Sequence, residues 1–395
     1  MNISLSPVAE LDFDIKPSSK LRLSVIVPAK DEETMIGITL EALRSQVDDQ
    51  GRAIDPAIYE VLVLANNCSD DTYQKCLSYQ QQYPEFRLAV EYRDIAAEIA
   101  HIGTVRRMLM DAAYSRLVST AGERGIIIST DADSEVDPTW IYHILQEMEK
   151  GVDVVGGRIL PKNTPKLSKI HHLRDVKYRF LRTRLESELD PCFTNPWPRH
   201  FQCFGPSMAM TCGIYVLAGR LPAIPYLEDE EFRKALIRVD AKFRHSTKVR
   251  ISTSARFDGR VAFGFSVQLQ KWSQMSINQQ EQMVESLYSF ATKLKIKSEL
   301  RKAWKLKTFA DHLDLTFSIH QLGLRRHALM QMICENTYFE SFWEQIEKHI
   351  SFYCPEMNGT VPISKAIEEF RCYFSGIHSL KSHDLNQRAV PLIAV

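Results

Sequence analysis

Four acidic residues follow directly on an apolar run in the stretch IIISTDADSEVDPTW, residues 126–140. They are Asp131, Asp133, Glu135 and Asp137. Asp137 stands just before Pro138 and can cap a helix, which leaves Asp131 and Asp133 for another purpose. Two carboxylates one residue apart repel each other unless a cation lies between them, and hard divalent cations prefer oxygen ligands. The pair therefore predicts a metal site, with an acid/base pair and a plain helix cap as the alternatives.

Short apolar runs alternate with helix-like segments between residues 23 and 157. The runs expected as strands are 23–27, 60–64, 87–91, 125–130 and 152–157. The segments expected as helices are 33–46, one that begins near Asp70 or Asp71, 103–121 and 138–151. This alternation is typical of a mostly parallel sheet with helices on both faces, which binds its ligands at the carboxyl ends of the strands. The loops at those ends are 28–33, 65–72 and 130–135, and all three are polar and rich in acids or amides.

The pattern changes after residue 157. The sequence predicts irregular, proline-containing structure up to about residue 265 and a largely helical region from Ser273 onward. In the second region lies a basic segment, KLKIKSELRKAWKLK (293–307). It can be a docking surface for an anionic lipid or an acidic acceptor, or simply a solvated helix face whose apolar residues Leu294, Leu300, Ala303 and Trp304 pack inward.

Composition excludes several classes of protein. Lys+Arg and Asp+Glu both number 49, so a nucleic-acid-binding surplus of positive charge is absent. No apolar run is long enough to span a membrane, and the acidic N-terminus is unlike a secretory signal. Eight cysteines without a C-x-x-C pair indicate free thiols in a reducing compartment, so we expect a soluble cytoplasmic protein.

Four segments in this order resemble the nucleotide-binding half of family-2 glycosyltransferases with the GT-A fold. They are VIVPAKDEE, ANNCSDDT, GTVRRMLMDAA and STDADS. The resemblance extends over roughly residues 22–262 and implies a Rossmann-like, mostly parallel sheet with helices on both faces and a helical C-terminal region. The implied organisation is an N-terminal segment 1–21, a GT-A domain 22–265 with a nucleotide-binding half (22–157) and an acceptor half (158–265), and a helical region 266–395.

The resemblance also implies a donor site. Its nucleoside is lined by Pro28, Ala29, Lys30, Asp31 and Glu32, with Asp31 or Glu32 toward the ribose. Asn66 and Asn67 occupy the place where the family usually has an aspartate that accepts from the base. The remaining donor-site residues are Arg106 or Arg107 at the base or diphosphate, Asp131, Ala132 and Asp133 at the ribose and metal, and Arg256 near the leaving phosphates. Asp133 is the firmer metal ligand, and His245 is either a third ligand or a packed histidine.

The segment 204–232 resembles the acceptor platform of the family, which ends in a Glu-Asp pair. By position this pair is Glu228-Asp229, and the resemblance implies inversion with Asp229 as the base and Glu228 in a structural role. Because Glu230 and Glu231 follow, the choice of base stays open by a residue, and the four acids can also be a solvated helix start.

The sequence thus predicts an inverting glycosyltransferase that uses Mn²⁺ or Mg²⁺ and a nucleoside-diphosphate sugar, with UDP favoured by family habit and GDP open. The acceptor is unidentified: a small molecule, a glycan or a lipid-linked molecule. The common Q-x-x-R-W motif of polymer synthases is absent, which favours transfer of a single sugar. The rival interpretations are a nucleotidyltransferase and a catalytically silent sugar-nucleotide-binding protein.

Overall fold

The chain forms two compact units in the computed structural model, which describes residues 10–162, 164–254, 264–306 and 313–376. Unit 1 comprises Met1–Pro165, Cys192–Gln270 and Met332–Glu344. Unit 2 comprises Lys166–Pro191, Lys271–Gln331 and Gln345–Val395. Residues 166–191 therefore group with C-terminal segments, although they precede the acceptor platform in the sequence.

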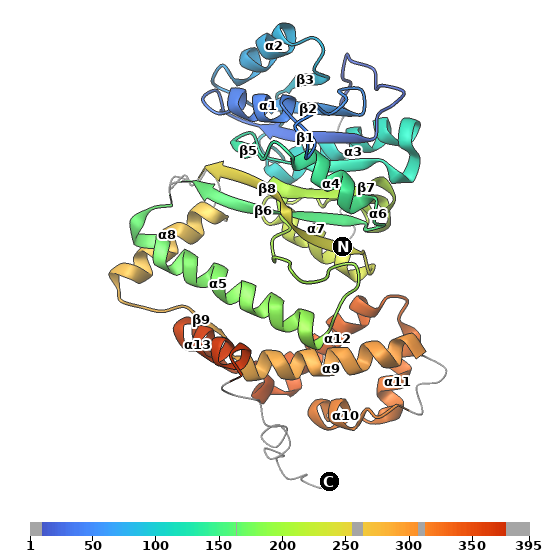
Figure 1. Cartoon of the computed structure of the whole chain (residues 1–395), viewed down its shortest axis with the longest axis vertical. Helices are drawn as coiled ribbons and strands as arrows, with labels where there is room; N and C mark the ends of the chain where they lie inside the picture. Colours follow the sequence, from blue (N-terminus) through green and yellow to red (C-terminus); the bar gives the residue numbers. More distant parts are fainter. Residues whose placement is uncertain (1–9, 163, 255–263, 307–312, 377–395) are drawn as a thin grey trace. The chain divides into compact units, whose positions relative to one another are not determined.

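Unit 1 is built on an eight-stranded sheet with the strand order β3-β2-β1-β4-β7-β6-β8-β5 (Figure 1). The strands are β1 Leu23–Ala29, β2 Tyr59–Asn66, β3 Leu88–Arg93, β4 Ile126–Ser129, β5 Ser134–Val136, β6 Val154–Lys162, β7 Met208–Thr211 and β8 Phe243–Ser254. Strands β1 to β4 are mutually parallel, β6 is parallel to β8, and β7 and β5 pair antiparallel to their neighbours. The predicted mostly parallel sheet is confirmed.

Helices cover both faces of this sheet, because successive side chains of a buried strand point to opposite sides. In β1, Val25 and Val27 face a core formed with α1 (Ile36–Arg44), α2 (Thr72–Gln82) and α4 (Trp140–Met148). Ile26 faces the opposite core, formed with α3 (Ile102–Ala121), α6 (Cys212–Leu217) and α7 (Glu228–Arg238). Short 3-10 turns precede β4 and β7, at Gly122–Arg124 and Gly205–Ser207.

The expectation of irregular structure after residue 157 is wrong. Strand β6 continues to Lys162, and α5 runs for 24 residues, Lys166–Leu189. Helix α5 escaped detection because its first turns bury polar side chains and expose aliphatic ones, so the usual amphipathic pattern is missing. The three-residue strand β5 was also missed, since it lies within the acidic stretch after the D-x-D.

Unit 2 is largely helical, as the sequence predicts for the region after Ser273. Its elements, some of which continue into unit 1, are α5, α8 Phe265–Ile277, α9 Leu287–Leu306, α10 Thr316–Leu322, α11 Arg326–Glu335, α12 Phe339–Tyr353, the 3-10 turn Pro355–Asn358 and α13 Ile363–Phe374, with a hairpin of β9 Met283–Glu285 and β10 Thr360–Pro362. Its core combines residues of α5, α9 and α13, among them Tyr178, Leu294 and Phe370. Among the described helices, none is both long and apolar enough to cross a membrane.

The basic segment 293–307 lies mostly on α9. Its apolar residues Leu294, Leu300 and Ala303 are buried, as the solvated-face interpretation requires, whereas Trp304 is only partly buried. Two of its cations are paired: Lys293 lies 2.9 Å from Glu285, and Arg301 lies 2.8 Å from Asp190. The described part of this segment is therefore chiefly a packed helix with a polar outer face.

Candidate active site

The three acidic or amide-rich loops meet at one edge of the sheet. Strand β1 pairs in parallel with both β2 and β4, with Ala29 opposite Ala65 and Ile26 opposite Ser129. The carboxyl ends of the three strands therefore lie side by side, and the loops that follow them converge. This edge is where a doubly covered α/β sheet binds its ligands.

Hydrogen bonds tie the first two loops together. Asp31 Oδ1 accepts from the backbone N–H of Ser69 at 2.7 Å and from its hydroxyl at 3.0 Å. The backbone N–H of Glu32 donates to Thr72 Oγ1 at 2.7 Å. Asp31 has a positive φ of 49°, an uncommon conformation that short polar side chains tolerate best. The carboxylate of Asp31, predicted to face a ribose, is thus engaged in holding the loop.

The two asparagines of the second loop have different surroundings. The side chain of Asn67 bonds both backbone groups of Ile95: its Nδ2 donates to the carbonyl at 2.9 Å, and its Oδ1 accepts from the N–H at 3.2 Å. It therefore extends the β2–β3 pairing in place of a backbone peptide. Asn66 is buried and donates to Asn67 Oδ1 at 3.3 Å, while no described residue donates to Asn66 Oδ1. Of the two amides, Asn66 retains an acceptor for a base.

Arg106 is the centre of the site. Its guanidinium donates to Ser129 Oγ at 2.5 Å and to Asp131 Oδ1 at 3.1 Å, and its Nε lies 3.2 Å from Glu228 Oε1. The side chain is 4% exposed, whereas that of Asp131 is 30% exposed. A buried cation thereby joins the end of β4 to the N-terminus of α7, more than ninety residues further along the chain.

The packing around Arg106 leaves no room for a larger residue at Gly205. A Cβ built there would lie 2.6 Å from Nη1 and 2.7 Å from Cζ of Arg106. The neighbouring Arg107 points elsewhere: it pairs with Asp111 at 2.5 Å and donates to the carbonyl of Leu221 at 2.7 Å. Between the two candidate arginines, Arg106 alone contacts the D-x-D.

The electrostatics of the cluster are dominated by carboxylates. Burial raises the pKa of Asp131 to about 6; Asp133 and Glu228 add to the rise, and Arg106 opposes it. Burial also raises the pKa of Glu228, again opposed by Arg106. Burial lowers the pKa of Arg106, but the nearby acids outweigh it, and the net shift is upward. The guanidinium therefore stays charged.

Asp133, the second aspartate of the D-x-D, is held by hydroxyl groups from another strand. Its carboxylate accepts from the hydroxyl of Ser254 and, at 3.4 Å, from that of Thr253, both at the end of β8. Ala132, between the two aspartates, is buried in the core, and its carbonyl accepts from Thr39 Oγ1 at 2.7 Å. Ala132 is thereby fixed with its side chain in the core, and the carboxylates of Asp131 and Asp133 lie on either side of it.

A divalent cation fits this donor set. Asp131 and Asp133 supply hard oxygen ligands, and no described residue hydrogen-bonds Asp131 Oδ2. The hydroxyls of Thr130 and Ser134, on either side of the pair, are buried without a hydrogen-bond partner among the described residues. The ligand atoms of Asp31, Cys68 and Asp70 also lie within 4.8 Å of one another, but Asp31 and Asp70 accept hydrogen bonds that fix the loops.

His245 does not lie beside the D-x-D, so its role as a third ligand of that metal needs correction. It pairs with Gly156 on β6, whereas Ser254, which bonds Asp133, pairs with Lys162. Six residues of β6 separate the two positions, or about 20 Å at ~3.3 Å per residue. The packed-histidine alternative describes it: Asn195 Nδ2 contacts its Nδ1 at 2.9 Å, and burial lowers its pKa well below the usual value.

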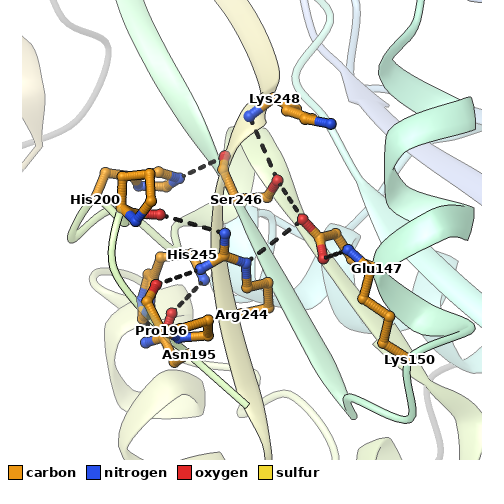
Figure 2. Close-up of polar contacts among 10 residues, drawn as sticks. Glu147, Lys150, Asn195, Pro196, His200, Arg244, His245, Ser246 and Lys248 are labelled. Carbon is orange, nitrogen blue, oxygen red and sulfur yellow. Dashed lines mark hydrogen bonds and ion pairs between the residues drawn. The ribbon is translucent and has the colours of Figure 1, made fainter. Parts of the chain in front are cut away.

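Figure 2 shows what surrounds His245. Arg244 donates to the carbonyl of Pro196 at 2.8 Å and lies 3.5 Å from Glu147, while Ser246 Oγ donates to Glu147 at 2.8 Å. His200 contacts the carbonyl of Ser246 through Nε2 at 3.0 Å. This network fixes the chain segment that leads to residues 204–232, the predicted acceptor platform.

The four consecutive acids at the start of α7 are used differently. Glu228 pairs with Arg106, Glu230 with Arg233 at 2.8 Å, and Glu231 with Lys234 at 2.6 Å. Asp229 instead accepts from backbone N–H groups: from Gly205 at Oδ2 and from Glu230 at Oδ1, both at 2.8 Å. Among the four, only Asp229 has no described cationic side chain within ion-pair distance.

Some site residues had little or no signal in the sequence. Ser129 and Gly205 lie inside motifs that were recognised, but their contacts with Arg106 depend on the fold. Thr253 and Ser254 gave no signal, because only the β5–β8 pairing brings them to Asp133. Arg256, predicted near the leaving phosphates, lies outside the described residues.

An α/β sheet with this topology and an acidic pair at the carboxyl end of a central strand is a nucleotide-diphospho-sugar transferase fold of the GT-A type. Residues 24–198 match the family model described as "Glycosyl transferase family 2". The match assigns this segment of the chain to the family, and the predicted enzyme class, a glycosyltransferase, is confirmed. No curated protein matches the chain.

Several solved glycosyltransferase structures match the fold of this chain at low sequence identity. S. aureus TarS 1–349 in complex with UDP-GlcNAc is 14% identical, with 90% of this chain and 92% of that chain covered and a TM-score of 0.44. The mannosyltransferase PcManGT from Pyrobaculum calidifontis, with GDP-Man and Mn²⁺, is 12% identical, with 94% and 85% covered and a TM-score of 0.41. Glucosyl-3-phosphoglycerate synthase from Mycobacterium tuberculosis is 16% identical, with 65% and 80% covered and a TM-score of 0.35.

Replacing Arg106 tests its role at the centre of the cluster. Arg106→Ala leaves Asp131 and Glu228 without their shared cation, and we expect the free energy of unfolding to fall by about 3–5 kcal/mol. The matched control, Arg107→Ala, removes a pair whose side chains are 30% and 32% exposed, and it should cost about 1 kcal/mol or less. Urea unfolding of both variants measures the difference. Equal stability of the two variants would contradict a central role for Arg106.

Buried His200 predicts a loss of stability in acid. Burial lowers its pKa to about 4, below the usual 6.5, so the unfolded chain takes up the proton first. The contribution of neutral His200 to the free energy of unfolding is therefore fully present above about pH 6.5, and it declines as the pH falls toward 4. His200→Gln keeps a side-chain N–H for Ser246 and should reduce this decline by up to ~1.4 kcal/mol per pH unit. Urea unfolding of both proteins between these pH values measures it, and identical pH profiles would show that His200 titrates normally.

Proposed function

We propose that this glycosyltransferase is a metal-dependent, inverting enzyme that moves a sugar from a nucleoside-diphosphate sugar, most simply a UDP-sugar, to an acceptor hydroxyl. One observation carries the proposal: Arg106 ties Asp131 of the D-x-D to Glu228, the residue before Asp229. A donor-binding motif and a candidate base are thereby held in one rigid cluster, as a displacement between two substrates requires.

The donor side has a role for each loop. The nucleoside lies along Pro28–Glu32, and Asn66 Oδ1 accepts from a ring N–H of the base. Asp131 and Asp133 hold the divalent cation, which when bound stabilises the negative charge that develops on the departing diphosphate. Arg106 orients Asp131 and favours its ionised form, since the guanidinium is permanently charged.

The acceptor side has one candidate base. As the acceptor oxygen bonds to the anomeric carbon, its proton passes to the carboxylate of Asp229. The bond from that carbon to the phosphate oxygen breaks, and the nucleoside diphosphate leaves with the electron pair. Each oxygen of Asp229 accepts one backbone N–H and keeps a second lone pair for this proton. Attack from the side opposite the leaving group inverts the anomeric centre.

Nucleotide binding tests the donor site. We expect isothermal titration to show that UDP binds more tightly with Mn²⁺ than without it, because the cation links the diphosphate to the two aspartates. Asp133→Ala should weaken this binding by at least 10- to 100-fold, the loss typical even of outer-shell partners of a metal. The control is Glu135→Ala, two residues on, whose exposed side chain pairs with Lys162. Tighter binding of GDP would keep the site and change the nucleotide, whereas no metal-dependent binding of either nucleotide would reject the proposal.

Turnover tests the base. Asp229→Asn preserves the size of the side chain and its acceptor for a backbone N–H but cannot take up the proton. We expect the release of nucleoside diphosphate in an acceptor screen to fall about 10²- to 10⁴-fold, with nucleotide affinity unchanged. Glu231→Gln, two residues further on the same helix, is the control and should retain activity. If Asp229→Asn turns over at the wild-type rate, another residue is the base.

A further inference from the structure

The N-terminal half of α5 is inverted relative to an ordinary surface helix. Its buried positions are polar or aromatic: Ser168, His171, Asp175 and Tyr178. Its exposed positions include three aliphatic residues at a spacing of three, Leu167 at 55%, Ile170 at 52% and Leu173 at 55% exposure. At about 100° per residue these three occupy roughly a third of the helix circumference, an arc that lies beside that of the buried positions and does not overlap it. The side that meets solvent therefore carries these three aliphatic residues.

The end of α8 extends this apolar surface within unit 2. The hydroxyl of Ser276 donates to the carbonyl of Leu167, and the rings of Trp272 and His172 lie 5.6 Å apart, so the two helices pack together. The next residue, Ile277, is 63% exposed. Single exposed aliphatic residues are ordinary on protein surfaces, but four on two packed helices indicate an interaction surface.

Positive charge accompanies the apolar residues. Lys166, Lys169 and Lys271 are exposed, and no described acid lies within ion-pair distance of them. Residues 166–174 and 271–277 contain no aspartate or glutamate at all. Over the whole chain acids and bases are equal in number, so these two segments carry a local surplus of cations.

We propose that this surface, formed by Leu167, Ile170, Leu173, Ile277 and the three lysines, docks on a lipid bilayer that carries anionic headgroups. Aliphatic side chains enter the boundary between headgroups and acyl chains, while lysines bind the anionic headgroups. A protein partner would more often present a surface with both signs of charge, and a second copy of the chain would oppose lysine to lysine. The docking is independent of which sugar the enzyme transfers, and it would bring the enzyme to acceptors at a membrane.

Flotation of the full chain with lipid vesicles tests the proposal. We expect binding to vesicles of equimolar phosphatidylcholine and phosphatidylglycerol and weak binding to phosphatidylcholine alone. In about 1 M NaCl, where the Debye length is about 3 Å, the binding to anionic vesicles should be largely lost.

Variants at exposed positions locate the surface without disturbing the core. Leu167→Gln with Ile170→Gln should lower the partition coefficient about tenfold or more, and Lys166→Glu with Lys169→Glu should lower it at least about 25-fold, since each lysine contributes roughly fivefold. The apolar control is Ile38→Gln on α1, and the charge control is Lys302→Glu with Lys305→Glu on α9; all three residues are exposed.

Three results would overturn the proposal. The first is absence of wild-type binding to anionic vesicles. The second is a loss in the α9 control equal to that of the α5 variants, which would reflect net charge alone. The third is a dimer in analytical ultracentrifugation that Ile170→Gln dissociates while vesicle binding is unchanged, since the occupant would then be a second copy. Circular dichroism of each variant confirms that the fold is intact.

Discussion

The buried guanidinium of Arg106 is the interaction on which the site depends. It brings together carboxylates that would otherwise repel one another, one at the end of a sheet strand and one at the start of a helix more than ninety residues later. Removing charged groups from water is costly unless they neutralise one another, which Arg106 and the two carboxylates do. The arrangement also requires a glycine at position 205, because a Cβ there would clash with the guanidinium of Arg106. The position of Asp229 follows from it, because Asp229 is held by the backbone N–H of that same glycine.

The rest of the site is held mainly by hydrogen bonds from uncharged donors. Asn67 substitutes for a backbone peptide next to β3, and serine and threonine hydroxyls at the end of β8 hold Asp133. Such contacts fix loop geometry without adding charge, which leaves the D-x-D with a surplus of negative charge for a cation to offset. The site therefore combines one buried cation with a frame of hydrogen bonds from neutral donors.

Helix α5 is an exception to the rule that apolar side chains lie inside a protein. Its buried side includes Asp175, which accepts from Arg179, and Tyr178, which donates to the carbonyl of Glu285. Those polar groups are satisfied locally, so the helix is stable although Leu167 and Ile170 face outward. The exposed aliphatic residues have no evident role in folding, and this is the reason to assign them an external partner.

The sequence by itself determined the strands of the parallel half of the sheet, the D-x-D at the end of one of them and the acidic start of α7. These features are local: a continuous apolar run indicates a buried strand, and two acids one residue apart indicate a candidate metal-binding pair. The tertiary structure decided which of two arginines reaches Asp131, which of two asparagines keeps a free acceptor, and where His245 lies. It also revealed α5, whose reversed faces hide the helical period. Those outcomes depend on strand register and on contacts between segments far apart in the chain, which no local pattern of residues encodes.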